Sequence, residues 1–294
     1  MPRKRGSKYA AFFLLPALIM LAVFVIYPVG RTTYISFFDE NGTFVGLKNY
    51  SKVLTSREII DLSGFSRGFP LGALVHNIIW VAIHLPLTII LGLSLAVLLK
   101  GVKGGSIIKS IVFLGMVMPM IIGGVMINFM FDRNLGVVNA FLGLFGFQAK
   151  SWTVYPDSAL LSLIFGSVWL WTGFSVILYS AGLETIPKDY YEAAKLDGAG
   201  PWKTFTKITI PLLKPITVVV ATMTLLWELK IFDIVYVTTA GGPGGASNVM
   251  ALQMYIYAFR ALDFNRAAVV AVILTLFTLL VSIPLVRSVR DDER

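Results

Sequence analysis

Three charged side chains interrupt an apolar run that begins at Pro215 and reaches Thr239: Glu228, Lys230 and Asp233. At the centre of a membrane helix each would cost about 2.5 to 3.5 kcal/mol on translocon scales, so they must face protein or water. Lys230 and Asp233 are three residues apart, a spacing that predicts an ion pair near the outer surface. Glu228 has no such neighbour, so we expect water, another subunit or a ligand hydroxyl to meet its carboxylate.

Aromatic and hydroxyl side chains recur at helical spacing on this run and on the apolar run before it. Aromatic rings stack on the C–H faces of a sugar, and a carboxylate accepts hydrogen bonds from its hydroxyls. The alternative is aromatic packing between helices, since Trp and Tyr are common at membrane boundaries. The residues predicted to bind a substrate are Ser167, Trp171, Phe174, Thr224, Trp227 and Glu228.

Other kinds of chemistry find little support in the sequence. The chain has no cysteine, which excludes thiol catalysis and thiolate metal sites. His76 and His84 match no metal-binding spacing, so we expect packed, hydrogen-bonded histidines and no metal site. The glycine-rich run 241–245 lacks a phosphate-binding pattern and predicts a turn. We therefore expect no catalytic residue and no enzyme, because an intramembrane enzyme would need paired acids or a histidine cluster.

The elements that would position these residues are membrane helices. Hydrophobic residues make up 56% of the chain and charged residues 14%, with a mean hydropathy of +0.79, which is too apolar for a soluble domain of this length. The prediction is an all-α integral membrane protein, one transmembrane domain over residues 1–294, with a short helix outside the core within 134–149. Six transmembrane helices are expected near residues 10–37, 71–99, 107–131, 158–183, 215–239 and 266–287.

Lys and Arg indicate which loops are cytoplasmic. If six helices alternate, fifteen of the basic residues share one face, in the two termini, the 100–109 loop and the 184–214 loop. Both termini and the 184–214 loop are therefore expected in the cytoplasm. The net charge of +9 indicates this topology and affinity for the lipid bilayer, not a nucleic-acid partner.

The 184–214 loop predicts two short helices. Pro187 and an early Glu192 suit a helix start, and Gly198 can adopt the left-handed conformation that ends a helix. Pro201 then starts a second helix, on which Trp202 lies apart from the basic side chains. The loop is thus predicted to form a helical hairpin at the membrane surface.

The loop sequence EAAKLDGAGPWKTFTKITIP (192–211) is accompanied by three further distinctive passages. They are VGLKNYSKVL (45–54), FDRNLGVVNAFL (131–142) and FDIVYVTTAGGPGGASNVMALQMYIYAF (232–259). Together they resemble the permease subunits of binding-protein-dependent ABC importers of the sugar type, in particular the larger permease of each maltose or glycerol-phosphate permease-like pair. Ile210 stands where this family usually has Leu, and Ser247 where it more often has Thr.

The resemblance implies an ABC type I importer permease fold, and a subunit that imports a sugar or glycoside delivered by an extracytoplasmic binding protein. It implies a second homologous permease and two ATPase subunits that bind ATP and Mg, with no cofactor in this chain, and a place in the cell membrane of a prokaryote. The residues that would couple to the ATPase are Glu192, Ala193, Ala194, Asp197, Gly198 and Pro211, and those that would dock the binding protein are Gly241, Gly242 and Pro243.

Two alternatives remain at this point. Glu192 could stabilise only its own helix, by about 0.3 to 1 kcal/mol. The chain could also be a stand-alone secondary transporter or channel for a small polar solute, although six helices without a visible inverted repeat are few for that class.

Overall fold

The computed structural model describes residues 6–291, and helices are the dominant element of that range. Within it no strand forms, apart from an isolated bridge between Phe38 and Phe44. The described residues form two compact units, one of residues 6–55 and 254–275 and the other of residues 56–253 and 276–291. The prediction of an all-α chain is confirmed for the described range.

The first unit begins with a nearly continuous helix. Its elements are α1 (Gly6–Leu21), the π-helical turn η1 (Ala22–Ile26), α2 (Tyr27–Ser36), α3 (Lys48–Leu54), the π-helical turn η3 (Ile256–Arg260) and the first part of α16 (Phe264–Asp291). Asn49 Nδ2 donates to the backbone oxygens of Ser36 and Phe38 at 3.0 and 2.8 Å, which fixes the turn after α2. The most apolar stretch of the helix over residues 12–36 contains no buried residue. Such a helix must face lipid or another subunit.

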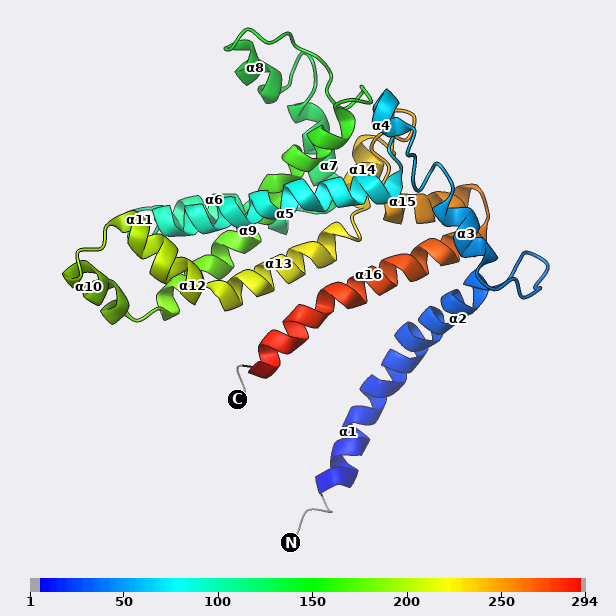
Figure 1. Cartoon of the computed structure of the whole chain (residues 1–294), viewed down its shortest axis with the longest axis horizontal. Helices are drawn as coiled ribbons and strands as arrows, with labels where there is room; N and C mark the ends of the chain where they lie inside the picture. The colour runs from blue at the N-terminus through cyan, green and yellow to red at the C-terminus, as the bar shows by residue number, and fades with distance from the viewer. Residues whose placement is uncertain (1–5, 292–294) are drawn as a thin grey trace. The chain divides into compact units, whose positions relative to one another are not determined.

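The second unit contains the remaining helices (Figure 1). They are α4 (Gly64–Arg67), α5 (Ala73–Leu98), α6 (Gly105–Val117), α7 (Met120–Met130), α8 (Val137–Gly143), α9 (Ala159–Thr185), α10 (Lys188–Leu196), α11 (Pro201–Thr204), η2 (Phe205–Thr209), α12 (Ile210–Leu212), α13 (Lys214–Glu228), α14 (Asp233–Thr238) and most of α15 (Met250–Tyr255).

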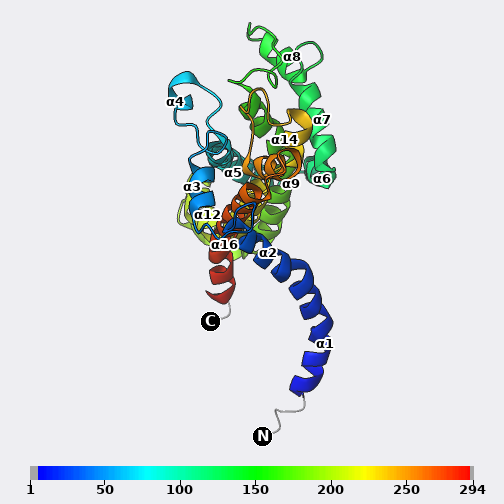
Figure 2. The same ribbon diagram turned by 90° about the vertical axis from the view of Figure 1, so that its right-hand side faces the viewer.

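Helix α9 is the centre of this unit, because it packs against α5, α6, α7, α13 and α14. Figure 2 shows α5 beside α9. The two helices approach closely at Gly92, where an added Cβ would lie 2.2 Å from the Cβ of Ser175. Small residues at such crossings let backbones approach in a membrane, where no hydrophobic force drives helices together.

Two of the predicted helices are broken. Over 107–131 the prediction of one helix is wrong, because α6 and α7 meet at 106°. Pro119 has no N–H to donate and forces the preceding residue into the extended region, so Met118 has φ −71° and ψ 141°. Over 215–239 the prediction is also wrong, because α13 ends at Glu228 and α14 starts only at Asp233.

Within residues 6–291, four helices are long and apolar enough to cross a membrane: Phe12–Ser36, Ala73–Leu98, Ala159–Thr185 and Phe264–Ile283. The number reaches six if each of two bent pairs forms one span. The first pair is α6 with α7, over the predicted third helix. In the second pair, Pro201–Leu212 and Lys214–Glu228 meet at 66°, so it joins the end of the predicted loop to the predicted fifth helix.

The predicted docking regions lie at opposite ends of the second unit (Figure 1). Helices α10 to α12 connect the end of α9 to the start of α13, whereas the glycine-rich loop 241–245 follows α14 near the other end of both helices. The short helix expected within 134–149 is α8.

Candidate functional site

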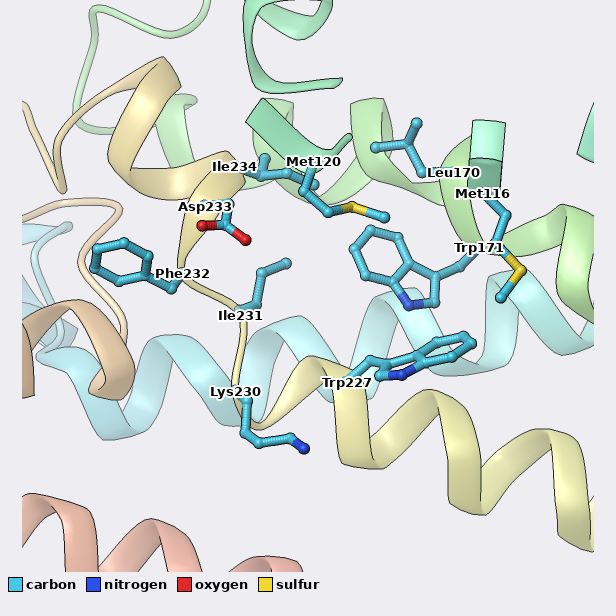
Figure 3. A pocket seen from close by; sticks show the side chains of 10 residues that line it. All are labelled: Met116, Met120, Leu170, Trp171, Trp227, Lys230, Ile231, Phe232, Asp233 and Ile234. Atoms are coloured by element: carbon cyan, nitrogen blue, oxygen red, sulfur yellow. The ribbon is translucent and has the colours of Figure 1, made fainter. Parts of the chain in front are cut away.

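A cavity of about 360 Å³ lies in the second unit, a size within the range of small-molecule sites. Its lining comes from α6, α7, α9, α13, α14 and the link between the last two. The lining residues are Met116, Met120, Leu170, Trp171, Trp227, Lys230, Ile231, Phe232, Asp233 and Ile234. In Figure 3 the two indole rings lie on one side, with Lys230, Phe232 and Asp233 on the other.

Aromatic rings form one wall of the cavity. The rings of Trp171 and Trp227 are 6.4 Å apart between centroids at an interplanar angle of 60°. Phe174 packs against Trp227 at 5.0 Å and 64°, away from the cavity lining. Edge-to-face contacts of this kind fix the orientation of the indoles and leave indole surface for the C–H groups of a ligand.

Both breaks in the helices border the cavity. Met116 and Met120 flank the bend at Pro119, while Lys230, Ile231 and Phe232 form the link between α13 and α14. Irregular backbone at membrane depth is tolerated only where protein buries it or where it lines a water-filled space. These lining residues were missed in the sequence, although Pro119 inside an uncharged run was the available signal for the first break.

Lys230 and Asp233 both line the cavity, but the predicted ion pair between them is absent from the described part of the chain. The pairing assumed one continuous helix. Phe232 instead has φ −138° and ψ −58°, which interrupts the helical spacing of the two side chains. The cavity therefore presents one ammonium and one carboxylate separately.

The expectation that Glu228 lacks a protein partner is wrong. Its Oε1 is 2.7 Å from Nδ1 of His84 on α5, and both side chains are fully buried. The sequence could not reveal this contact, which joins residues 144 positions apart. Glu228 lies beside the cavity rather than in its lining. The expectation of hydrogen-bonded histidines is confirmed, since His76 Nδ1 also lies 2.8 Å from the backbone oxygen of Asn248.

The other predicted substrate residues lie outside the cavity lining. The hydroxyl of Ser167 donates to the Ile164 oxygen of its own helix at 2.8 Å. Thr224 is fully buried one turn before Glu228. Of the six predicted residues, Trp171 and Trp227 line the cavity. No group of three or more His, Asp or Glu able to hold a metal occurs among the described residues.

The predicted docking hairpin has the expected helix end. Gly198 has φ +70°, its N–H donates to the Lys195 oxygen at 3.1 Å, and the Ala199 N–H donates to the Ala194 oxygen at 2.9 Å. This is a Schellman cap. A Cβ added at Gly198 would meet no atom within 4 Å, so the backbone angle alone calls for glycine.

The hairpin is anchored at its base and exposed elsewhere. Tyr191 reaches Thr209 Oγ1 at 3.3 Å, and the Lys100 ammonium lies 5.1 Å from the Tyr191 ring centre. Leu196 on α10 and Trp202 on α11 are 89% and 75% exposed, so the hairpin presents apolar side chains outside the helix packing of the second unit. Glu192 and Ala193 are exposed on α10, Ala194 is buried, Asp197 caps the helix and Pro211 lies in α12.

The glycine-rich loop forms the predicted turn. Ala240, Gly241, Gly244 and Gly245 have positive φ, and Gly242 and Pro243 are half-buried between them. Ser247 closes the turn, because its hydroxyl donates to the Gly242 oxygen at 2.6 Å.

Comparisons with known proteins agree with this architecture. Residues 88–290 match the family described as binding-protein-dependent transport system inner membrane component. A probable ABC transporter permease protein of Pyrococcus horikoshii is 58% identical over 94% of this chain and 96% of its own. The trehalose/maltose transport system permease protein MalF of Thermococcus litoralis is 35% identical over 86% and 84%. A bacterial alginate ABC transporter, solved in complex with an alginate pentasaccharide-bound periplasmic protein, superposes with a TM-score of 0.76 at 19% identity, over 95% and 93% of the two chains.

Proposed function

The chain belongs to the family of binding-protein-dependent transport system inner membrane components and is a membrane-embedded ABC importer permease, and from this we propose that its cavity conducts a sugar or glycoside. The cavity carries the proposal. Two indoles offer surfaces for sugar C–H groups, while Lys230 and Asp233 offer a donor and an acceptor for hydroxyls.

Similar proteins support this substrate class. One relative is named for trehalose and maltose, and the transporter with the same fold is solved with a protein that binds an alginate pentasaccharide. Family membership favours this function over the alternative of a stand-alone secondary transporter or channel. The family is a transport component, so the chain is not itself an enzyme.

We propose that this subunit assembles with a second homologous permease, two ATPase subunits that bind ATP and Mg, and an extracytoplasmic binding protein. The hairpin would contact an ATPase through Glu192, Ala193, Ala194, Asp197, Gly198 and Pro211. The exposed apolar side chains of Leu196 and Trp202, on either side of the Gly198 cap, support a partner surface there. The loop at Gly241, Gly242 and Pro243 would dock the binding protein, and its position away from the hairpin supports this (Figure 1).

This assignment requires the hairpin and both termini to be cytoplasmic. Cysteines placed singly at Lys195 and at Ser66, both exposed, should react with an impermeant thiol reagent from opposite sides, because the natural chain has no cysteine. Lys195→Cys should react only in opened cells, and Ser66→Cys in intact cells. Reaction of Lys195→Cys from outside intact cells would reverse the topology.

The substrate assignment is tested by uptake against a panel of sugars and glycosides in the reconstituted transporter. Trp171→Ala removes one stacking face and should weaken uptake or change solute preference, because aromatic contacts contribute about 0.5 to 1.5 kcal/mol beyond burial. Trp169→Ala is the matched control, since Trp169 belongs to the same helix but lies near Gly115 of α6, outside the cavity lining. Unchanged rates and preference in Trp171→Ala, or equal losses in both variants, would remove this wall from the substrate path.

A further inference from the structure

A second polar site lies between α5, α9 and α13, beside the cavity but outside its lining. Its centre is the fully buried contact of His84 Nδ1 with Glu228 Oε1 at 2.7 Å. The ring of Trp171 stands edge-on to His84, with centroids 5.3 Å apart. Trp171 is thus shared between this site and the cavity.

Several buried polar atoms around this contact have no hydrogen-bond partner among the described residues. They are Trp80 Nε1, His84 Nε2, Thr224 Oγ1 and Glu228 Oε2. Trp80 contacts His84, and Thr224 precedes Glu228 by one turn of α13. Buried polar groups cost free energy unless they are hydrogen-bonded, so such a cluster is retained for something other than stability.

The charge balance of this site is unusual. A neutral imidazole beside a carboxylate leaves one uncompensated negative charge away from water, which costs several kcal/mol. Among the described residues no lysine or arginine forms an ion pair with Glu228, and the two lysines nearest to it along the chain, Lys214 and Lys230, are exposed. The titratable groups on the helices and link around the pair are His76 on α5, Tyr179 and Glu184 on α9, Lys214 on α13, and Lys230 and Asp233 after it.

Two of these groups are committed to other contacts. Tyr179 donates its hydroxyl to Thr217 at 3.1 Å. His76 accepts the Leu71 N–H on Nε2 at 3.0 Å, so its Nδ1–H donates to the Asn248 oxygen and the ring is neutral. Neither can supply the missing positive charge.

We propose that the His84–Glu228 pair is a proton-binding site that holds one proton more than a free imidazole and a free carboxylate hold together at neutral pH. The proton comes from water and forms one N–H or O–H bond, giving either an imidazolium that donates to the carboxylate or a carboxylic acid that donates to the imidazole. When the pair separates in water, the proton returns to the solvent.

The position of the pair gives this proton a role. Glu228 is the last residue of α13, and its backbone oxygen accepts a hydrogen bond from Asn77 of α5 at 3.3 Å. Side chain and backbone of the same residue therefore clamp the helix end to α5. The link that follows lines the cavity with Lys230, Ile231 and Phe232. Protonation closes this clamp and holds one wall of the cavity in place.

The protonation state can be read directly by NMR of the ring nitrogens, because the chain has only two histidines. The labelled full chain would be assembled with unlabelled partners in lipid nanodiscs at neutral pH. His76 should be neutral with its proton on Nδ1. For His84 we expect either both nitrogens protonated or the proton on Nε2, with Nδ1 accepting from Glu228. A neutral His84 with its proton on Nδ1 means that the extra proton is absent, and this overturns the proposal.

A pH profile of uptake tests the consequence. Wild-type uptake, measured from about pH 6 to about pH 9, should fall at alkaline pH by up to about tenfold per unit above the midpoint of the pair. The double variant His84→Gln with Glu228→Gln keeps a neutral hydrogen bond and should show no such fall. The control is Glu58→Gln, an exposed carboxyl outside the site, which should keep the wild-type profile. A wild-type profile that matches the double variant contradicts the proton-dependent clamp.

Discussion

The hairpin of α10 to α12 and the cavity at Trp171 are held in shape in different ways. The hairpin depends on its own backbone, with a Schellman cap at Gly198 and a few contacts at its base. The cavity depends on side chains from α6, α7, α9, α13 and α14, drawn from Met116 to Ile234 along the chain. One region is an exposed surface and the other is a partly open cavity between helices.

This difference separates the expected effects of substitutions. A change in the hairpin should impair the contact with a partner and leave the cavity intact, because few groups outside the hairpin support it. A change in the cavity should alter solute handling and leave the hairpin able to dock. The crossing of α5 and α9 at Gly92 is the exception, because a change there should affect both the hairpin and the cavity.

The largest effect is expected at that crossing. Gly92→Leu would drive a side chain into Ser175, whose backbone lies 3.1 Å from an ideal Cβ at this position, so α5 and α9 must separate. Overpacking of this kind costs about 1 to 3 kcal/mol or more. We expect little folded subunit by size-exclusion chromatography and loss of both functions. Gly143→Leu on α8 meets nothing within 4 Å and should behave as wild type. A monodisperse, active Gly92→Leu complex would show that this crossing is not the common support.

The next largest effect is expected in the hairpin. Gly198→Val forces a branched residue to φ +70°, at a cost of about 1 to 3 kcal/mol, and should release the ATPase subunits from the purified complex. Glu192→Lys should act similarly by reversing an exposed charge. Gly198→Asn should be milder, because Asn tolerates the left-handed region.

Gly200→Val is the matched control for this prediction, since Gly200 has φ −69° and open space around its Cβ position. Co-elution of the subunits measures the result. Full ATPase stoichiometry with normal uptake in Gly198→Val would remove the hairpin from the partner contact.

A smaller effect is expected from the charged residues of the cavity. Lys230→Gln and Asp233→Asn each replace a charge-assisted hydrogen bond to a solute hydroxyl, worth about 1.5 to 3 kcal/mol, by a weaker neutral one. Competition between sugars for uptake should change by roughly tenfold or less. Lys103→Gln, in the loop after α5, serves as the control. Unaltered competition in both variants would show that Lys230 and Asp233 do not contact the transported solute.

The smallest effect is expected at Asp132, which belongs to neither region. Hydrogen bonds from the backbone N–H groups of Leu135 and Asn134, at 2.9 and 2.8 Å, hold the pKa of this carboxyl below its ordinary value. A lowered pKa stabilises the loop above the unfolded pKa, and this stabilisation is lost as the pH falls through the folded pKa.

Asp132→Ala should therefore speed hydrogen exchange of those two amides at neutral pH, with uptake and ATPase assembly unchanged. In the wild type the protection of the same amides, taken relative to their intrinsic exchange rates at each pH, should be lost only in acid. Exchange that does not differ between Asp132→Ala and wild type at neutral pH would contradict the role of the carboxylate.

The same contrast explains what the sequence could predict. The hairpin was predictable because Pro187, Gly198 and Pro201 act on their immediate neighbours through backbone angles. The aromatic wall was found because Trp171 and Trp227 fall on helical faces. Helix periodicity was less reliable at Pro119 and after Glu228, where the expected continuous helices are broken.

Contacts between distant parts of the chain were beyond the reach of spacing rules. Glu228 seemed unpaired because its partner, His84, is on another helix. Lys230 and Asp233 were predicted to pair because they are three residues apart on what was taken as one continuous helix. No proline or glycine between them indicates the break. Met116 and Met120 acquire a place in the cavity only through the bend at Pro119.

A paired measurement can show whether the cavity and the hairpin act separately. Sugar uptake and ATP hydrolysis stimulated by the liganded binding protein would be measured in the same proteoliposomes for Trp171→Ala and Gly198→Val. We expect Trp171→Ala to keep stimulated hydrolysis while its uptake falls or changes preference, and Gly198→Val to lose both. Parallel loss of hydrolysis and uptake in Trp171→Ala, or stimulated hydrolysis retained in Gly198→Val, would contradict their separation.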